Sequence, residues 1–73
     1  MNAKEAREYL QRIPDDEPVF VLRAQDALAT HAILVWVWLA AALGVCEEKR
    51  VGAAAVIDQF ETWQKIHPPK LPD

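Results

Sequence analysis

The chain has 73 residues, 52% of them hydrophobic, and a formal net charge of −3 at pH 7. This composition argues against a polymeric nucleic acid as partner, because backbone binding requires clustered Lys and Arg, whereas the eight basic residues here are intermixed with acids. A small anionic ligand remains compatible, since a local pocket can be basic on an acidic protein.

The first predicted element is a short helix over residues 2–13. Asn2 can cap it, Glu5 stands three residues later as in a capping box, and Pro14 prevents its continuation. An apolar stripe with Tyr9 at its edge is formed by Ala3, Ala6, Leu10 and Ile13. One face of this helix is therefore expected to pack.

A connector is predicted over residues 14–25. Pro14 and Pro18 fix a loop, and the run Val19 to Leu22 has strand propensity but no second run with which to pair. We expect an extended, packed segment that ends in the basic and amide side chains of Arg23 and Gln25.

Two longer helices are predicted next, over residues 26–43 and 47–66. Asp26 is the expected cap of the first, and Gly44 is its expected C-terminal stop. The second carries an apolar face of Ala53, Val56, Ile57, Phe60, Trp63 and Ile66. Residues 67–73 are predicted to be an extended tail, with a solvated His67. The fold class is thus all-α, a single domain of three helices over residues 1–73, the last two long and antiparallel.

The segment Ala27–Cys46 carries no charge over 20 residues, which is about the length that crosses a bilayer. Thr30, His31 and the stop at Gly44 interrupt it, and four basic residues lie on each side, so no positive-inside bias orients an insertion. We predict a buried central helix and no membrane partner. Because such a helix is apolar all round, neighbouring protomers are expected to cover it.

Self-association is also expected from the length of the chain, because a domain of this size buries only ~60% of the surface that its unfolded form exposes. The single cysteine, Cys46, excludes an intramolecular disulfide, and no metal-ligand spacing is present. An unpaired cysteine and a charged start, MNAKEARE, predict a cytoplasmic protein without a signal peptide.

Catalysis has little support in the sequence. His31 and Cys46 lie 15 residues apart along one predicted helix, about 22 Å, which excludes a hydrogen-bonded nucleophile pair. Cys46 is expected to be a small buried side chain, and His31 a first-turn residue bonded to a neighbour. We predict no enzyme, no cofactor and no metal site.

A short helix that carries Tyr9, then DDEPVFVLRAQDALA, then two helices, resembles the small phage anti-CBASS proteins, which act as sponges for cyclic oligonucleotide signals. The distinctive portion is Tyr9 together with residues 15–29. The resemblance implies a three-helix protomer, assembled as a hexamer, that sequesters cyclic dinucleotides without cleaving them. It further implies separate sites between protomers for cyclic trinucleotides and, if the chain is phage-encoded, a location in the host cell cytoplasm.

The same resemblance assigns base stacking to a tyrosine on the first helix and phosphate contact to a basic residue just after the connector, and Tyr9 and Arg23 match these positions. Arg12 shares a helix face with Tyr9, and either Arg23 or Gln25 faces the ligand. The predicted ligand-binding residues are Tyr9, Arg12, Arg23 and Gln25. The residues also allow a purely structural interpretation, in which Tyr9 packs on the connector and Arg23 pairs with a carboxylate.

Two other function classes remain open from the sequence. One is a helical interaction module or inhibitor that binds a protein partner through its last helix, and the other is a small single-span membrane protein.

Overall fold

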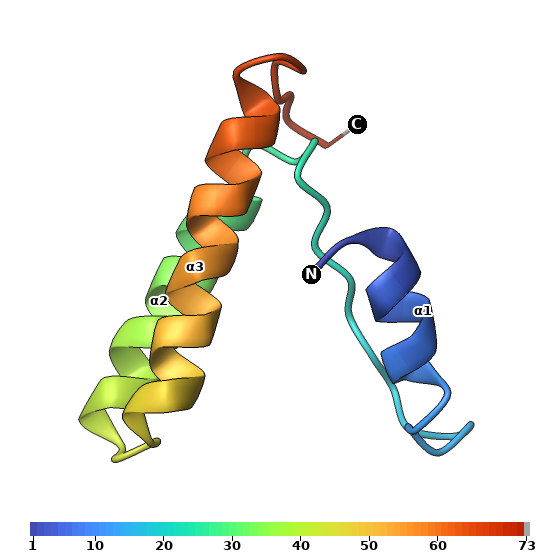
Figure 1. Cartoon of the computed structure of the whole chain (residues 1–73), viewed down its shortest axis with the longest axis vertical. Coiled ribbons are helices and arrows are strands. Elements are labelled where there is room, and N and C mark those ends of the chain that lie inside the picture. Colours follow the sequence, from blue (N-terminus) through green and yellow to red (C-terminus); the bar gives the residue numbers. More distant parts are fainter. Residues whose placement is uncertain (73) are drawn as a thin grey trace.

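The computed structural model describes residues 1–72, which form three helices and no strand: α1 (Ala3–Leu10), α2 (Ala29–Ala42) and α3 (Glu47–Gln64). The all-α prediction is therefore confirmed for the part of the chain described. All three helices are shorter than the sequence predicted. Helices α2 and α3 run antiparallel, side by side, as a hairpin, while α1 stands apart from them (Figure 1).

The start of α1 forms as predicted. The Glu5 N–H donates to Asn2 Oδ1 at 2.9 Å, and the Asn2 N–H donates to Glu5 Oε1 at 3.3 Å, which completes the capping box. After Leu10 the chain continues in tighter turns, in which Arg12 and Ile13 donate to carbonyls three residues earlier. These turns carry the chain to Pro14.

The start of α2 differs from the prediction. The helix begins at Ala29, and its N-cap is Leu28, whose side chain makes no capping bond. The Asp26 carboxylate accepts instead from the Leu28 N–H at 2.8 Å, two residues along. Asp26 therefore closes an Asx turn that leads into the helix, because a short polar side chain bonds the backbone two residues on.

The end of α2 confirms the role of Gly44. Its φ is 80°, and the Val45 N–H donates to the Ala40 carbonyl at 2.9 Å while the Gly44 N–H donates to the Ala41 carbonyl at 3.4 Å. These two bonds make a Schellman motif, which ends the helix and starts the turn into α3.

The core is confined to the seam of the hairpin. Ala29 and Ala40 are the buried hydrophobic residues among those described, and their small side chains let the two helices approach closely. Half-buried positions at helical spacing continue the seam on both helices: Ile33, Val37, Ala53, Val56, Ile57 and Phe60. Three predictions fail here, because Trp63, Ile66 and Cys46 are exposed.

The arm, as we call residues 1–22, is α1 with the loop and extended segment that follow it. Among the described residues only α2 and α3 pack helix on helix, so α1 faces its own connector. The connector is extended, as predicted, but it is not packed within the protomer: Phe20 is 87% exposed. The radius of gyration is 13.3 Å, against about 11 Å for a compact domain of this length.

The tail is not merely solvated. Asp26 and Lys70 form a parallel β-bridge, in which the Ala27 N–H donates to the Lys70 carbonyl at 2.8 Å and the Lys70 N–H donates to the Gln25 carbonyl at 3.0 Å. His67, predicted to be solvated, is exposed but stacks on Trp63, with ring centroids 4.0 Å apart. The chain thus returns from the end of α3 to the end of the connector.

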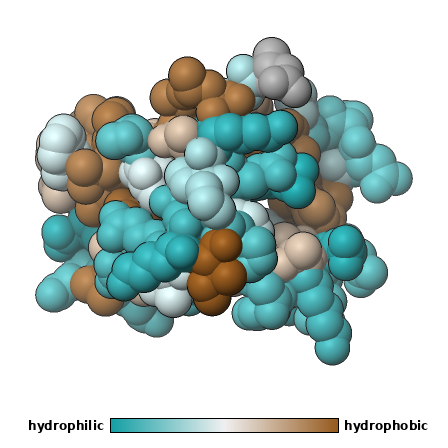
Figure 2. Space-filling model, turned by 90° about the horizontal axis from the view of Figure 1, so that it is seen from above, coloured by the Kyte–Doolittle hydropathy of each residue, from teal (hydrophilic) through white to brown (hydrophobic). Residues whose placement is uncertain are grey.

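Much apolar surface is left open by this arrangement. Trp38, Leu39 and Leu43 on the outer side of the hairpin are 63%, 56% and 82% exposed. Seen from above, brown hydrophobic residues reach the surface in several places among hydrophilic ones (Figure 2). Within residues 1–72, no helix combines the length and the apolar character needed to cross a bilayer.

Candidate functional site

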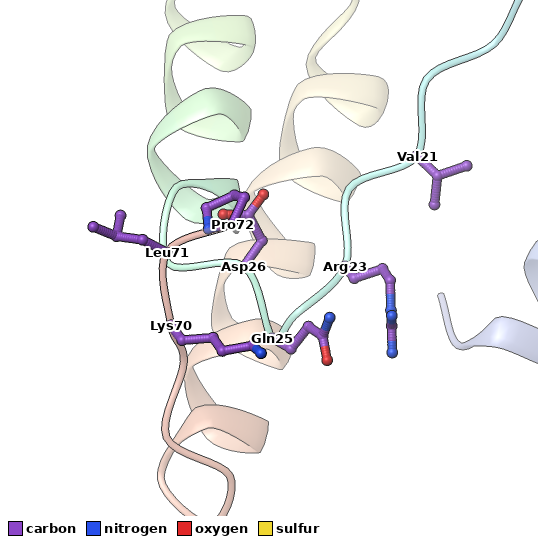
Figure 3. Close-up of a pocket in the computed structure, with 7 residues that line it drawn as sticks. All are labelled: Val21, Arg23, Gln25, Asp26, Lys70, Leu71 and Pro72. Atoms are coloured by element: carbon purple, nitrogen blue, oxygen red, sulfur yellow. The ribbon is translucent and has the colours of Figure 1, made fainter.

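The end of the connector and the tail enclose a shallow pocket of about 140 Å³, which we call the connector pocket (Figure 3). It lies where the β-bridge joins two segments far apart in the sequence. Its lining residues are Val21, Arg23, Gln25, Asp26, Lys70, Leu71 and Pro72. Two of the four predicted ligand-binding residues, Arg23 and Gln25, therefore share one pocket.

Three long-range hydrogen bonds hold the walls of the connector pocket together. Two are the backbone bonds of the bridge between Lys70 and residues 25 and 27. The third joins the side-chain amide of Gln64, at the end of α3, to the Ala24 carbonyl at 2.9 Å. The backbone that carries Gln25 is thus fixed from the tail on one side and from the hairpin on the other.

The side chains of the connector pocket present mainly hydrogen-bond donors. The Lys70 side chain extends toward Gln25, and Arg23 projects from the connector on the other side of Gln25 (Figure 3). The Asp26 carboxylate points away from these three side chains, and it accepts from the Leu28 N–H. Within residues 1–72 neither Arg23 nor Lys70 is paired with a carboxylate by an ion pair. The predicted alternative for Arg23, a structural salt bridge, therefore does not form among these residues.

A second, larger pocket of about 430 Å³ lies between α1 and the connector, and we call it the arm pocket. It is mostly apolar, and its lining residues are Met1, Ala6, Tyr9, Leu10, Ile13, Val19, Phe20, Val21 and Leu22. Tyr9 is 52% exposed, so its ring borders this pocket without being buried in it. Val21 lines both pockets, which makes them neighbours on the surface.

The predicted site residues thus divide into three groups. Arg23 and Gln25 lie together in the connector pocket, Tyr9 lies in the adjoining arm pocket, and Arg12 lines neither. Arg12 lies in the tight turns that follow the end of α1 at Leu10, and its side chain lines neither pocket.

Lys70 is the lining residue that sequence reasoning missed. The stretch HPPKLPD does signal an extended conformation, since each proline fixes its own φ near −65°. What the stretch cannot signal is the partner against which it lies, because the pairing joins residues that are far apart in the sequence. The three prolines were the available hint of an ordered segment.

The side chains that line these pockets can contact an anion and a flat ring. A guanidinium, an ammonium and a carboxamide can donate to phosphate oxygens, and an aromatic ring at an apolar pocket can stack on a base. Among the residues described, no group of three His, Cys, Asp or Glu side chains is placed to hold a metal ion.

Comparison of the chain with known protein families, with curated proteins and with solved structures found no match. The two pockets and the exposed apolar surface are therefore the features that bear on function.

Proposed function

We propose that the protein binds cyclic oligonucleotides and sequesters them without cleaving them, as a homo-oligomer. The observation that carries this proposal is the contact between an apolar pocket that bears Tyr9 and a donor-rich pocket that bears Arg23 and Gln25, joined at Val21. A nucleotide has a flat base and an anionic phosphate at its two ends, so it requires two such surfaces next to each other.

The volumes of the two pockets support a base in the arm pocket and a phosphate in the connector pocket. Pockets that enclose a whole small molecule usually have volumes of about 300 Å³ or more. The arm pocket, at about 430 Å³, is large enough to receive a base, whereas the connector pocket, at about 140 Å³, suits a single phosphate group. Both are open on one protomer, and a second protomer against the arm would enclose the ligand.

The exposed surface supports the oligomer. The protomer exposes 6192 Å², against about 4,600 Å² for a compact monomer of its mass. The difference is about 1,600 Å², or about two interfaces of standard size at ~800 Å² on each partner. A C2 interface would present a pair of identical sites to a cyclic dinucleotide, which has two bases and two phosphates. A hexamer, with cyclic trinucleotides at separate sites, belongs to the same proposal.

Calorimetry of the full chain against a panel of cyclic di- and trinucleotides with adenine and guanine bases tests the proposal. Binding to at least one ligand is expected, and chromatography of the denatured complex should return the ligand intact. Tyr9→Ala and Arg23→Ala should each weaken binding by roughly tenfold or more, because each removes a stacking or charge-assisted contact.

Arg7→Ala is the matched control, because Arg7 is exposed on α1 and lines neither pocket. It should bind like the parent. Arg12→Ala tests the predicted ligand-binding role of Arg12, which lines neither pocket. This variant should also bind like the parent. Equal affinity of the parent, Tyr9→Ala and Arg23→Ala would show that the site lies elsewhere.

A protein interaction module is the second candidate, and the outer side of α2 favours it. Trp38, Leu39 and Leu43 offer a partner an exposed apolar face. If the parent protein binds none of the cyclic nucleotides at any concentration tested, this candidate replaces the sponge.

A further inference from the structure

The connector pocket takes its two basic side chains from segments that are far apart in the sequence, Arg23 from the connector and Lys70 from the tail. In Figure 3 the Lys70 side chain extends toward Gln25, which lies between Lys70 and Arg23 in this view. Building on the proposed function, we infer that Lys70 is a second phosphate-binding residue and that residues 68–72, which we call the strap, form one wall of the ligand site.

Both backbone polar groups of Lys70, the N–H and the carbonyl, are hydrogen-bonded. Its N–H donates to the Gln25 carbonyl, and its carbonyl accepts from the Ala27 N–H. Its position is therefore set by the same two residues that flank Asp26 in the connector. A ligand that meets Lys70 and Gln25 meets side chains whose backbones are already held in place relative to each other, and such preorganisation lowers the entropy lost on binding.

The composition of the strap reinforces this placement. Pro68, Pro69 and Pro72 restrict the backbone on both sides of Lys70. Proline at positions whose native conformation suits it reduces the freedom of the unbound chain, so less entropy is lost when the segment docks. The strap is consequently suited to carry one long basic side chain to a fixed point.

The charges of the connector pocket fit a phosphodiester. Its lining residues include two cations, Arg23 and Lys70, and one carboxylate, Asp26. Because Asp26 accepts from the Leu28 N–H and points away from the donors, it leaves their side of the pocket positive. Two cations and one carboxylate leave a formal excess of one positive charge, which one phosphodiester neutralises. The small volume of the pocket selects the phosphate group, and the base of the same nucleotide is left to the arm pocket.

Substitution of Lys70 in the full chain tests the inference, with calorimetry against the same panel of cyclic dinucleotides. Lys70→Ala should weaken binding by about fivefold or more. This loss is smaller than that expected for a buried charged contact, because the Lys70 side chain is exposed. Lys70→Arg keeps the charge and should bind within about twofold of the parent. The matched control is Lys65→Ala, because Lys65 is exposed next to the end of α3 and lines neither pocket.

Thermal unfolding followed by circular dichroism should show the same melting temperature for Lys70→Ala and Lys65→Ala, since the bridge uses only the backbone of residue 70. If the parent binds a cyclic dinucleotide and Lys70→Ala binds it as tightly, the inference is overturned while the proposed function stands.

A second experiment distinguishes a failure of the Lys70 inference from a failure of the proposed function. Titration of the parent with inorganic pyrophosphate, followed by NMR, should shift the backbone amides of Gln25 and Lys70, and these shifts should be lost in Lys70→Ala. If pyrophosphate causes these shifts but no cyclic nucleotide binds, the connector pocket is an anion site and the proposed sequestration of cyclic oligonucleotides is refuted. If neither pyrophosphate nor any cyclic nucleotide shifts these amides, the inference fails as well.

Discussion

The side-chain amide of Gln64 donates a hydrogen bond to the carbonyl oxygen of Ala24 at 2.9 Å, and this bond joins the last residue of α3 to the end of the connector. Ala24 directly precedes Gln25, so the hairpin fixes the backbone next to the connector pocket. The stability of the hairpin and the geometry of the site are linked through this one side chain.

Gln64→Ala should therefore lower both stability and affinity. Loss of a typical intramolecular hydrogen bond costs about 1 kcal/mol of unfolding free energy. Urea unfolding measures that cost, and calorimetry with a cyclic dinucleotide measures the loss of affinity. Thr62→Ala, at an exposed position in the same turn of α3, is the control: it should leave the affinity unchanged and should not lower the stability, because alanine favours a helix more than threonine does. An unchanged affinity in Gln64→Ala would show that the connector keeps its position without this bond.

Asp26 should prove structural through its Asx turn. Asp26→Ala removes the acceptor of the Leu28 N–H and should cost about 1 kcal/mol, as does the loss of a comparable cap. Asp26→Asn keeps an oxygen at that place and should retain most of the stability. Melting temperatures of the two variants measure the difference. Equal melting temperatures for the parent and Asp26→Ala would contradict the assignment.

The two glycines should respond to alanine in opposite directions. Gly44 has a φ of 80°, where an L-residue costs about 1–2 kcal/mol, so Gly44→Ala should destabilise the protein. Gly52 lies within α3, and a Cβ there would meet nothing within 4 Å. Gly52→Ala should stabilise the helix by about 0.5–1 kcal/mol. Chemical unfolding of both variants checks the signs, and a neutral Gly44→Ala would argue against the Schellman turn.

Light scattering of the unmodified protein should give a mass that is a multiple of the 8.3 kDa protomer. Trp38 is 63% exposed on one protomer, and Trp38→Glu should lower the measured mass, because the charge would have to be buried in the interface. Circular dichroism shows whether the variant keeps its helices. Thr62→Glu places the same charge on α3 and should keep the mass of the parent. A monodisperse 8.3 kDa parent would refute the oligomer.

Local signals made much of the fold predictable from the sequence. The capping box of Asn2 and Glu5 and the stop at Gly44 are formed by neighbouring residues, so their chemistry is visible in a short window. The predicted start of α2 at residue 26 is too early. The Asp26 carboxylate accepts from a nearby backbone N–H, and such a bond can close a turn as well as cap a helix. A short polar side chain alone does not distinguish the two.

The site was predictable only where its residues are close in sequence. Arg23 and Gln25 come from one extended segment, and they do share a pocket. Lys70 reaches that pocket through a pairing with Asp26, far away in the sequence, which no local pattern encodes. The burial of Trp63 and Cys46 was wrongly predicted, because helical periodicity identifies an apolar face but does not say whether the same chain covers it.

The bridge between Asp26 and Lys70 also has a kinetic consequence. The α2–α3 hairpin closes over a short turn, whereas the bridge closes a loop that includes both helices, and the entropy cost of closure grows with loop length. The strap is therefore expected to dock after the hairpin has folded. Because few hydrogen bonds hold it, it should also open locally while the helices persist. Amide protons of Ala27 and Lys70 would then exchange with solvent faster than those in the middle of α2, and a bound anion would slow them without slowing the rest.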